Sequence, residues 1–364
     1  MHPAENEEQS QYATKHRRKR KEQQVNIEDF NYDLPKELIA QIPLERRDLA
    51  RLMVVDRATG TIEHRHFRDL LSYLSAGDVM VINDTRVNEA SFSCRKDTTG
   101  ASIDILLTGR KSPTRFTALV RPLKRLHVGE TCTVTSDISL RLIERDDDGD
   151  ALLEFSRDPY TSEEFRALAR VQIPPYIKQF PQDPEAYQTV YAKEPGSVAA
   201  PTAGLHFTPD LLTGIRNAGV SIEHVTLNVG LGTFQPVRVN VIETHHMHTE
   251  RFTLPEETAR AVNDARAKHR AVTAIGTTVV RTLESCIDKD GTVRSGAGET
   301  GIFIYPPYDF HGFDHLVTNF HLPKSTLLML VGAFMGMDLM WAAYHEAIRE
   351  RYRFFSFGDA MLIL

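Results

Sequence analysis

Hydrophobic and polar residues follow two different patterns along this chain. The run 78–82 is apolar after Asp78 and predicts a buried strand that ends in a polar turn, where α/β folds place ligand-contacting residues. From about residue 91 to 156 the pattern changes to short β-runs, as in a small barrel. These runs lie at 103–107, 115–120, 131–134, 140–143 and 152–155, and the last two flank an acidic turn that suits a hairpin.

Strand and helix patterns alternate in the second half of the chain. The helix expected after Ser325 is nearly all apolar, so it must lie in the centre of its domain. The predicted fold is an α/β main domain with an inserted small all-β barrel domain. In the main domain we expect strands at 225–229, 271–275, 301–305 and 315–320, and further helices at 255–268 and 279–287.

The domain boundaries follow from these patterns. The discontinuous α/β catalytic domain is expected at 25–90 and 157–364, and the barrel at 91–156. Residues 1–24 form a polar tail with a dense cationic run at 15–21, which is typical of a disordered segment. This run either adds a salt-sensitive grip on a phosphate backbone or only keeps the chain in solution.

The composition is that of an ordinary globular protein, with 41% hydrophobic and 25% charged residues in a chain of 364. A net charge of −6 argues against nucleic-acid binding by the whole surface but allows one basic face. Cys94, Cys132 and Cys286 are too few and too scattered for a disulfide framework, so we expect a cytoplasmic protein. The longest apolar run, 327–337, is too short to cross a bilayer, and we expect no membrane partner.

One histidine, His206, stands in a stretch of small, turn-permissive residues at 196–208. Thr208 predicts the start of a helix that ends before Gly219. The position of His206 before this start suits a histidine that faces a ligand lying close to the backbone. It equally suits a histidine that only hydrogen-bonds a buried loop.

A strand leads directly into a helix through Gly276, Thr277 and Thr278. The backbone N–H groups and two hydroxyls at this helix start form a ready site for a carboxylate or a phosphate, unless the threonines only cap the helix. Arg281 and Glu284 lie three positions apart on one face of the helix. They either pair with each other or line the same site.

Three further polar residues stand at the ends of expected strands. His321 either acts as an acid or base near neutral pH or orients a loop through a hydrogen bond. Asp84 and Arg86 follow the first apolar run, where they either contact a ligand or form a salt bridge with each other.

A histidine cluster is weak evidence for a metal site. On a strand, His246, His248 and Glu250 would share one face, with His245 beside them. The nearby glycines around Gly230 would let a ligand approach the backbone, although this spacing alone has little specificity. We predict that the protein holds no metal.

Several long, irregular motifs of this chain match one known family. Together they closely resemble the S-adenosylmethionine:tRNA ribosyltransferase-isomerase family of queuosine biosynthesis, from about residue 28 to the end. The resemblance implies the same architecture, an α/β domain with an inserted β-barrel. The motifs lie at 33–35, 51–54, 83–87, 187–192, 196–208, 229–238, 247–250, 276–285, 318–327 and 352–361.

The resemblance implies an enzyme that transfers and isomerises the ribosyl moiety of S-adenosylmethionine onto 7-aminomethyl-7-deazaguanine in a tRNA anticodon. The product is epoxyqueuosine, and adenine and methionine leave. S-adenosylmethionine is then a consumed substrate rather than a methyl donor, and no cofactor is expected. The expected partners are S-adenosylmethionine and the anticodon region of tRNA, and the expected state is a monomer.

On this resemblance, His206 or His321 carries proton transfer and Asp84 supplies polar positioning. The helix start at Gly276 is expected to receive the methionine carboxylate. The residues expected to bind substrate are Arg86, Thr202, Gly204, Gly230, Gly232, Thr233, His248, Thr277, Thr278, Arg281, Glu284, Asn319 and Lys324.

The chain departs from the family pattern at Asn88, Glu89, Ser91, Asn228 and Pro307. Asn228 stands where the family has a histidine, and an asparagine cannot act as a general base at neutral pH. The donor motifs therefore match the family better than the acceptor motifs do. The alternatives are a paralogue that uses the same donor on another RNA or on a free deazapurine, and a tRNA-binding protein without turnover.

Overall fold

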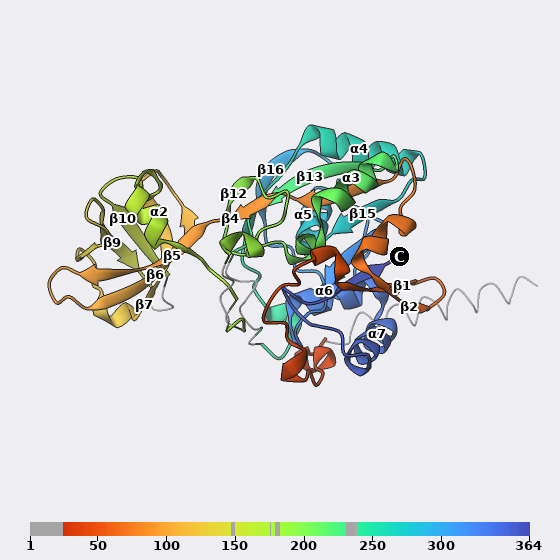
Figure 1. Ribbon diagram of the computed structural model, residues 1–364, viewed down its shortest axis with the longest axis horizontal. Coiled ribbons are helices and arrows are strands. Elements are labelled where there is room, and N and C mark those ends of the chain that lie inside the picture. The colour runs from red at the N-terminus through yellow and green to blue at the C-terminus, as the bar shows by residue number, and fades with distance from the viewer. Residues whose placement is uncertain (1–24, 147–149, 175, 179–182, 231–236, 238) are drawn as a thin grey trace, which may run out of the picture.

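The computed structural model describes residues 25–146, 150–174, 176–178, 183–230, 237 and 239–364. A large body of sheet and helices is joined to a smaller β-barrel, drawn at the left of Figure 1, through strands β4 (Thr85–Val87) and β5 (Glu89–Lys96). The fold class predicted from the sequence is confirmed. The predicted disorder of the cationic tail lies outside the described residues.

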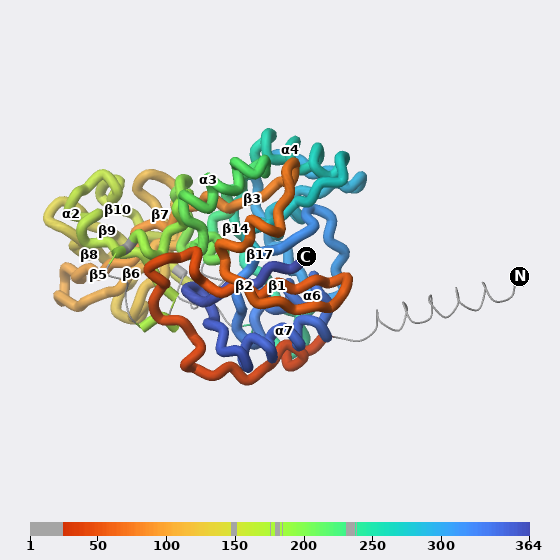
Figure 2. The backbone as a smooth tube through the Cα atoms, turned by 45° about the vertical axis from the view of Figure 1, so that its right-hand side comes forward, coloured from red at the N-terminus to blue at the C-terminus, as the bar shows by residue number. Residues whose placement is uncertain are grey.

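The larger body is built on a nine-stranded mixed sheet with the order β16-β14-β13-β3-β15-β17-β18-β1-β2. Its central strands β13, β3, β15 and β17 run parallel, so their carboxyl ends lie at one edge of the sheet. The last strand returns beside the first, as Figure 2 shows. The strands are β1 (Arg51–Val55), β2 (Ile62–His66), β3 (Val79–Asn83), β13 (Ser221–Leu227), β14 (Glu250–Leu254), β15 (Val272–Ile275), β16 (Gly296–Thr300), β17 (His315–Asn319) and β18 (Ala360–Ile363).

Both faces of the sheet are covered, which explains why its central strands are continuously apolar. In β3, Val79 and Val81 pack into one core, whereas Met80 and Ile82 pack into a second core on the opposite face. Helices α4 to α7 contribute to the first core and α3 to the second. The helices are α3 (Pro209–Asn217), α4 (Glu256–Ala267), α5 (Thr277–Ser285), α6 (Thr326–Met335) and α7 (Met337–Arg349).

The inserted barrel closes because its first strand, β5, also pairs with β8. The six antiparallel strands follow the order β5-β6-β7-β10-β9-β8. Alternate residues such as Phe92 and Cys94 point into the barrel, and Phe165 of helix α2 packs against them. The remaining elements of this part are β6 (Ser102–Arg110), β7 (Arg115–Arg121), β8 (Thr131–Thr133), β9 (Ser139–Arg145), β10 (Asp150–Phe155), α2 (Glu163–Leu168) and β11 (Arg170–Val171), which pairs with β5.

Most predicted elements are confirmed, with one clear exception. Leu142 of β9 lies opposite Leu153 of β10, as the predicted hairpin requires. The strand predicted at 301–305 is wrong, because the preceding Gly296–Thr300 forms β16 and pairs with β14. The apolar side chains of 302–305 pack against the core from outside the sheet, so their pattern does not report a strand.

Short elements connect these parts. A separate two-stranded parallel sheet joins β4 to β12 (Glu194–Ser197) at the junction of the two bodies. The described residues also form short 3-10 helices: η1 (Ile27–Phe30), η2 (Lys36–Leu38), η3 (Arg47–Leu49), η4 (Phe67–Tyr73), η5 (Leu123–Arg125), η6 (Pro159–Thr161), η7 (Pro184–Tyr187), η8 (Thr202–His206) and η10 (Ile242–Thr244).

Helix α6 is buried in the first core, as its apolar sequence predicts. No single helix within the described chain is long and apolar enough to cross a membrane. Only α6 and α7 taken together reach that length and composition, and they are bent by 117° to each other.

Candidate active site

A cavity of about 500 Å³, the sheet-edge cavity, opens at the carboxyl ends of β15 and β17. Three of the sequence motifs meet there: 200–203, the helix start at 276–278 and the loop 318–325. The C-terminal segment adds Phe355 and Ser356. Open α/β sheets place ligands at this edge, because loops leave the parallel strands there side by side.

The start of α5 presents unused donors to the sheet-edge cavity. Gly276 precedes the helix with φ +90°, a conformation that side chains rarely adopt. Neither threonine makes a side-chain cap, so the alternative that they only cap the helix finds no support. The Thr278 hydroxyl is buried and has no hydrogen-bond partner among the described residues. Together with the unpaired N–H groups of a helix start, it forms a site suited to an anion.

Arg281 lies one turn further along α5 and also lines this cavity. It forms a buried ion pair with Glu250 of β14, in which the two side chains are 7% and 4% exposed. Its Nε atom has no partner within the described chain, so a second unpaired donor lies three positions after Thr278 on the same helix. Arg281 thus pairs with Glu250 and not with Glu284, the partner that helix spacing suggests.

Glu284 serves the packing of a loop instead. Its carboxylate accepts backbone N–H bonds from His311 at 3.0 Å and Gly312 at 2.7 Å, and the Tyr308 hydroxyl at 3.2 Å. Burial raises the pKa of Glu284, while these donors oppose that shift. The residue does not line the sheet-edge cavity, so the structure gives no contact for the predicted substrate-binding role.

His321 lines the sheet-edge cavity. Its Nε2 atom lies 2.8 Å from the Thr318 hydroxyl, and burial lowers the pKa of the ring to about 3. Its backbone is held separately: the N–H donates to the Tyr344 hydroxyl at 3.0 Å and the carbonyl accepts the Tyr32 hydroxyl. The ring is therefore neutral near pH 7 and free of the bonds that fix its loop.

His206 lies behind the cavity wall. Its ring packs on Phe67, with centroids 4.9 Å apart, and Nε2 lies 3.2 Å from the amide nitrogen of Asn319. Burial, with the nearby Arg353 and Arg47, lowers the pKa of His206 to about 3. The expectation that this ring faces the ligand is corrected, because the turn of η8 points it into the core; its catalytic role stays a prediction.

Asn319 connects His206 to the sheet-edge cavity. It lines the cavity, accepts the Thr202 hydroxyl at 3.0 Å and donates to the Phe355 carbonyl at 3.2 Å. Thr202 lines the same cavity. The predicted binding residues Thr202 and Asn319 are therefore in contact, and His206 lies within hydrogen-bond distance of Asn319.

Two residues around this cavity adopt left-handed backbone angles without being glycine. Lys324 has φ 58° and Phe355 has φ 72°. Such angles cost free energy and persist where surrounding structure holds them, often at functional sites. Lys324 is held through its N–H to the Phe30 carbonyl at 2.8 Å and through its ammonium to Glu28 at 2.6 Å.

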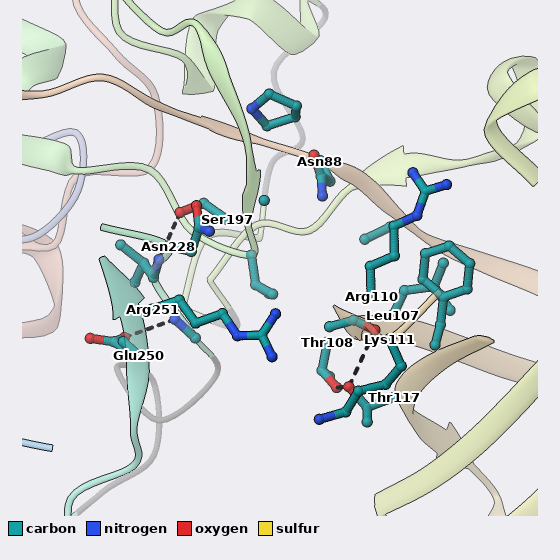
Figure 3. Close-up of a pocket in the computed structure, with 18 of the residues that line it drawn as sticks. Asn88, Leu107, Thr108, Arg110, Lys111, Thr117, Ser197, Asn228, Glu250 and Arg251 are labelled. Atoms are coloured by element: carbon teal, nitrogen blue, oxygen red, sulfur yellow. Dashed lines mark hydrogen bonds between the residues drawn. The ribbon is translucent and has the colours of Figure 1, made fainter. Parts of the chain in front are cut away.

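A second cavity of about 610 Å³, the interdomain cleft, lies between the barrel and the larger body. Figure 3 shows Arg110 and Lys111 of the barrel on one wall, and Asn228 and Arg251 on the other. Val229 lines both cavities. The cleft thus combines barrel cations with residues that follow strand β13.

Glu250 and Gly230 form part of the wall between the two cavities. Glu250 lines the cleft and accepts the Gly230 N–H at 2.8 Å, while its other oxygen pairs with Arg281. The predicted residues Gly232 and Thr233 lie outside the described residues.

Besides Glu284, His206 and His248, three predicted residues line neither cavity. Asp84 is buried and accepts the Thr226 hydroxyl at 2.6 Å, whereas Arg86 pairs with Glu185, so the two do not pair with each other. Gly204 packs against Tyr191, whose hydroxyl occupies the space a Cβ would need. Asp84 and Gly204 thus have partners inside the protein and Arg86 has an ion-pair partner at the surface, while none of the three lines either cavity.

The predicted face of strand residues 246, 248 and 250 is wrong. Strand β14 begins only at Glu250, and His248 is exposed in the preceding segment. His245 packs against Phe303 instead. Among the described residues no group of three metal-ligating side chains comes together.

Sequence reasoning missed part of both cavities. Tyr176, Phe355 and Ser356 line the sheet-edge cavity, and Arg110 and Lys111 line the cleft. Phe355 and Ser356 lie inside a matching C-terminal motif, which was the available signal. No local pattern marked Tyr176 or the barrel cations.

Removal of Glu250 should be costly. In Glu250→Ala, Arg281 and the Gly230 N–H lose their partner, and we expect a loss of about 3–5 kcal/mol in the free energy of unfolding. Glu299→Ala is the control, because Glu299 also lines the cleft but forms an exposed pair with Arg251 and should cost at most about 1 kcal/mol. Urea unfolding measures both; equal losses would contradict the assigned importance of the buried pair.

The buried histidines should make stability depend on pH. Their pKa is lowered from 6.5 to about 3, so the unfolded state binds protons first as the pH falls. Their contribution is fully present above pH 6.5 and is lost as the pH falls towards 3. The double variant His206→Gln/His321→Gln should flatten the unfolding free energy over this range, whereas His248→Gln, at an exposed position, should not.

Comparison with known proteins agrees with this arrangement. The family model described as "Queuosine biosynthesis protein" matches residues 27–363. A protein of Symbiobacterium thermophilum named S-adenosylmethionine:tRNA ribosyltransferase-isomerase is 50% identical over 341 residues, which cover 93% of this chain and 100% of that protein. The 2.00 Å crystal structure of an S-adenosylmethionine tRNA ribosyltransferase from Thermotoga maritima is 39% identical, covers 92% of this chain and 100% of its own, and gives a TM-score of 0.53. The chain belongs to the queuosine biosynthesis protein family, as its motifs predict.

Proposed function

We propose that this protein transfers and isomerises the ribosyl moiety of S-adenosylmethionine onto 7-aminomethyl-7-deazaguanine in tRNA, giving epoxyqueuosine, adenine and methionine. The observation that carries the proposal is the sheet-edge cavity, where an anion-binding helix start and a neutral buried histidine line one space. The names of the relatives support the same donor and the same class of acceptor.

The donor binds with its methionine carboxylate at the start of α5. The Thr277 and Thr278 N–H groups, the Thr278 hydroxyl and the free Nε of Arg281 supply donors for that carboxylate. In the free protein Arg281 is already paired with Glu250, so its buried charge is not left unpaired when no donor is bound.

His321 accepts the proton that starts the reaction. The sulfonium acidifies the hydrogens on the ribose 5′ carbon, and a base beside it produces an ylide that opens the ring and expels adenine. The proton passes to adenine, the acceptor amine attacks the 1′ carbon and loses its own proton, and ring closure displaces methionine. Burial keeps the His321 ring neutral near pH 7, and in the tautomer whose Nε2–H donates to the Thr318 hydroxyl the basic lone pair lies on Nδ1.

Thr202 and Asn319, bonded to each other, fix the cavity wall on which the proposed reaction depends, and His206 holds Asn319 in place. On this reading His206 is a positioning residue that acts through Asn319. Asp84, bonded to Thr226 and away from both cavities, fixes the chain near the domain junction.

The acceptor nucleotide enters through the interdomain cleft, which shares Val229 with the sheet-edge cavity. Arg110 and Lys111 provide positive charge for the anticodon backbone on the barrel side. Asn228 lines this cleft and accepts the Thr85 hydroxyl at 3.0 Å, so this departure from the family falls on the acceptor side. The protein works as a monomer in the cytoplasm, where tRNA is available, and needs neither a metal nor a cofactor.

Incubation of the protein with S-adenosylmethionine and tRNA that carries 7-aminomethyl-7-deazaguanine should release adenine and increase the mass of the nucleoside. EDTA should leave the rate unchanged, because no metal takes part. Adenine release without a tRNA product would favour a paralogue with another acceptor, and tRNA binding without adenine release would favour a binding protein.

Replacement of His321 should affect catalysis more than replacement of His206. His321→Ala should lower single-turnover adenine release by about 10²–10⁴-fold, the usual range for a general base. The fold should remain, because the His321 backbone bonds to Tyr32 and Tyr344 do not involve its ring. His206→Ala should lower the rate about tenfold through Asn319, about 1.4 kcal/mol of barrier. A near wild-type rate for a folded His321→Ala protein would refute the assignment.

A further inference from the structure

Two aromatic side chains form a stacked pair on the wall of the sheet-edge cavity. The rings of Tyr176 and Phe355 are parallel to within 26°, with centroids 4.4 Å apart, and both residues line the cavity. Nothing in the proposed proton transfer or carboxylate binding uses them. They come from segments far apart in the sequence, and the tertiary fold brings them together.

The Phe355 half of this pair is held at several points. Its backbone has the left-handed φ of 72°, its N–H donates to the Phe320 carbonyl at 3.1 Å, and its carbonyl accepts the Asn319 amide. Such an angle costs a phenylalanine free energy, and it persists where the surrounding structure holds it. The strain places a flat apolar ring at a defined position in the cavity.

The Tyr176 half is held as well. Its hydroxyl lies 2.6 Å from the Ser356 hydroxyl, and its carbonyl accepts the Gln41 side-chain amide at 3.0 Å. Burial raises the pKa of this phenol to about 12, so the group stays neutral and the ring stays apolar. A rigid aromatic surface of this kind suits a planar, uncharged ring, because stacking then costs little side-chain entropy.

We propose that the Tyr176–Phe355 pair is the purine subsite of the sheet-edge cavity, against which the adenine of the donor stacks before it leaves. This inference rests on the proposed function, and it adds the residues that recognise the donor's base. The start of α5 and the aromatic pair belong to the same cavity, so one ligand contacts both. Adenine has a π-face that every aromatic side chain accepts, whereas the carboxylate end needs donors.

Two fragments of the donor separate the two subsites. 5′-Methylthioadenosine contains the purine and the ribose without the carboxylate or the sulfonium charge, and methionine contains the carboxylate without the purine. Calorimetric titration of the full-length protein gives the Kd of each fragment and of S-adenosylmethionine. The variants are Tyr176→Leu, which keeps apolar volume without a π-face, and Tyr176→Phe, which keeps the ring but loses the bond to Ser356.

Tyr176→Leu should raise the Kd of 5′-methylthioadenosine and of S-adenosylmethionine by about tenfold to a hundredfold and leave the Kd of methionine unchanged. Tyr176→Phe should stay within about threefold of the wild type, because the stacking surface remains. Thr278→Val should show the reverse pattern, with a higher Kd for methionine and an unchanged Kd for 5′-methylthioadenosine. Tyr73→Ala, at the last residue of η4, where the Tyr73 hydroxyl bonds Arg65 and Glu63, is the control for the loss of a tyrosine elsewhere.

Each outcome decides between the claims. Unchanged 5′-methylthioadenosine affinity in a folded Tyr176→Leu protein would overturn the purine subsite. A loss confined to S-adenosylmethionine would also overturn it, because only that ligand carries the sulfonium that an aromatic ring attracts. Normal binding of both adenosine ligands by a wild-type protein that never releases adenine would overturn the proposed function while the subsite stands.

Discussion

The buried ion pair between Arg281 and Glu250 is the contact on which the two cavities depend. It joins helix α5 to strand β14 and stands in the wall that separates the sheet-edge cavity from the interdomain cleft. Two charges taken out of water are stable only when each is paired and bonded, and here Glu250 also receives the Gly230 N–H. The same contact therefore holds the helix start, the cavity wall and the chain that leaves β13.

Burial also determines the protonation of the site. Both histidines are buried, and desolvation is the first cause of the low pKa of each ring. A neutral imidazole accepts a proton, whereas an imidazolium would repel the sulfonium of the proposed donor. The bonds that fix the His321 backbone come from two tyrosine hydroxyls, so they do not use the ring.

The parallel centre of the sheet explains why distant motifs converge. Strands β3, β13, β15 and β17 end at one edge, and the segments that follow β15 and β17 both line the sheet-edge cavity. The chain enters the barrel after β4, which pairs with β12. This connection places Arg110 and Lys111 of the barrel across the cleft from the residues that follow β13. One topology thus places the sheet-edge cavity and the interdomain cleft side by side.

Local chemistry was enough to predict much of this protein. The capping of α3 by Thr208, the alternating barrel strands and the apolar helix α6 depend on neighbouring residues, so periodicity and turn residues reveal them. The motifs likewise named Thr202, Thr278, Arg281, Asn319 and His321, all of which line one cavity. The pattern failed at 301–305, where apolar side chains pack on the core without joining the sheet, and at His248, where β14 starts later than expected.

Only the tertiary structure decided which way side chains point and which distant partners they meet. Gly204 and Glu284 stand in matching motifs yet serve packing, because Tyr191 and the loop around Gly312 reach them from elsewhere in the chain. His206 turns into the core, and Glu250 rather than Glu284 becomes the counter-ion of Arg281. The sequence therefore determined the elements and the chemical groups available, since these depend on neighbours along the chain. The tertiary structure decided which side chains pair, since burial and contact depend on residues that are far apart in the sequence.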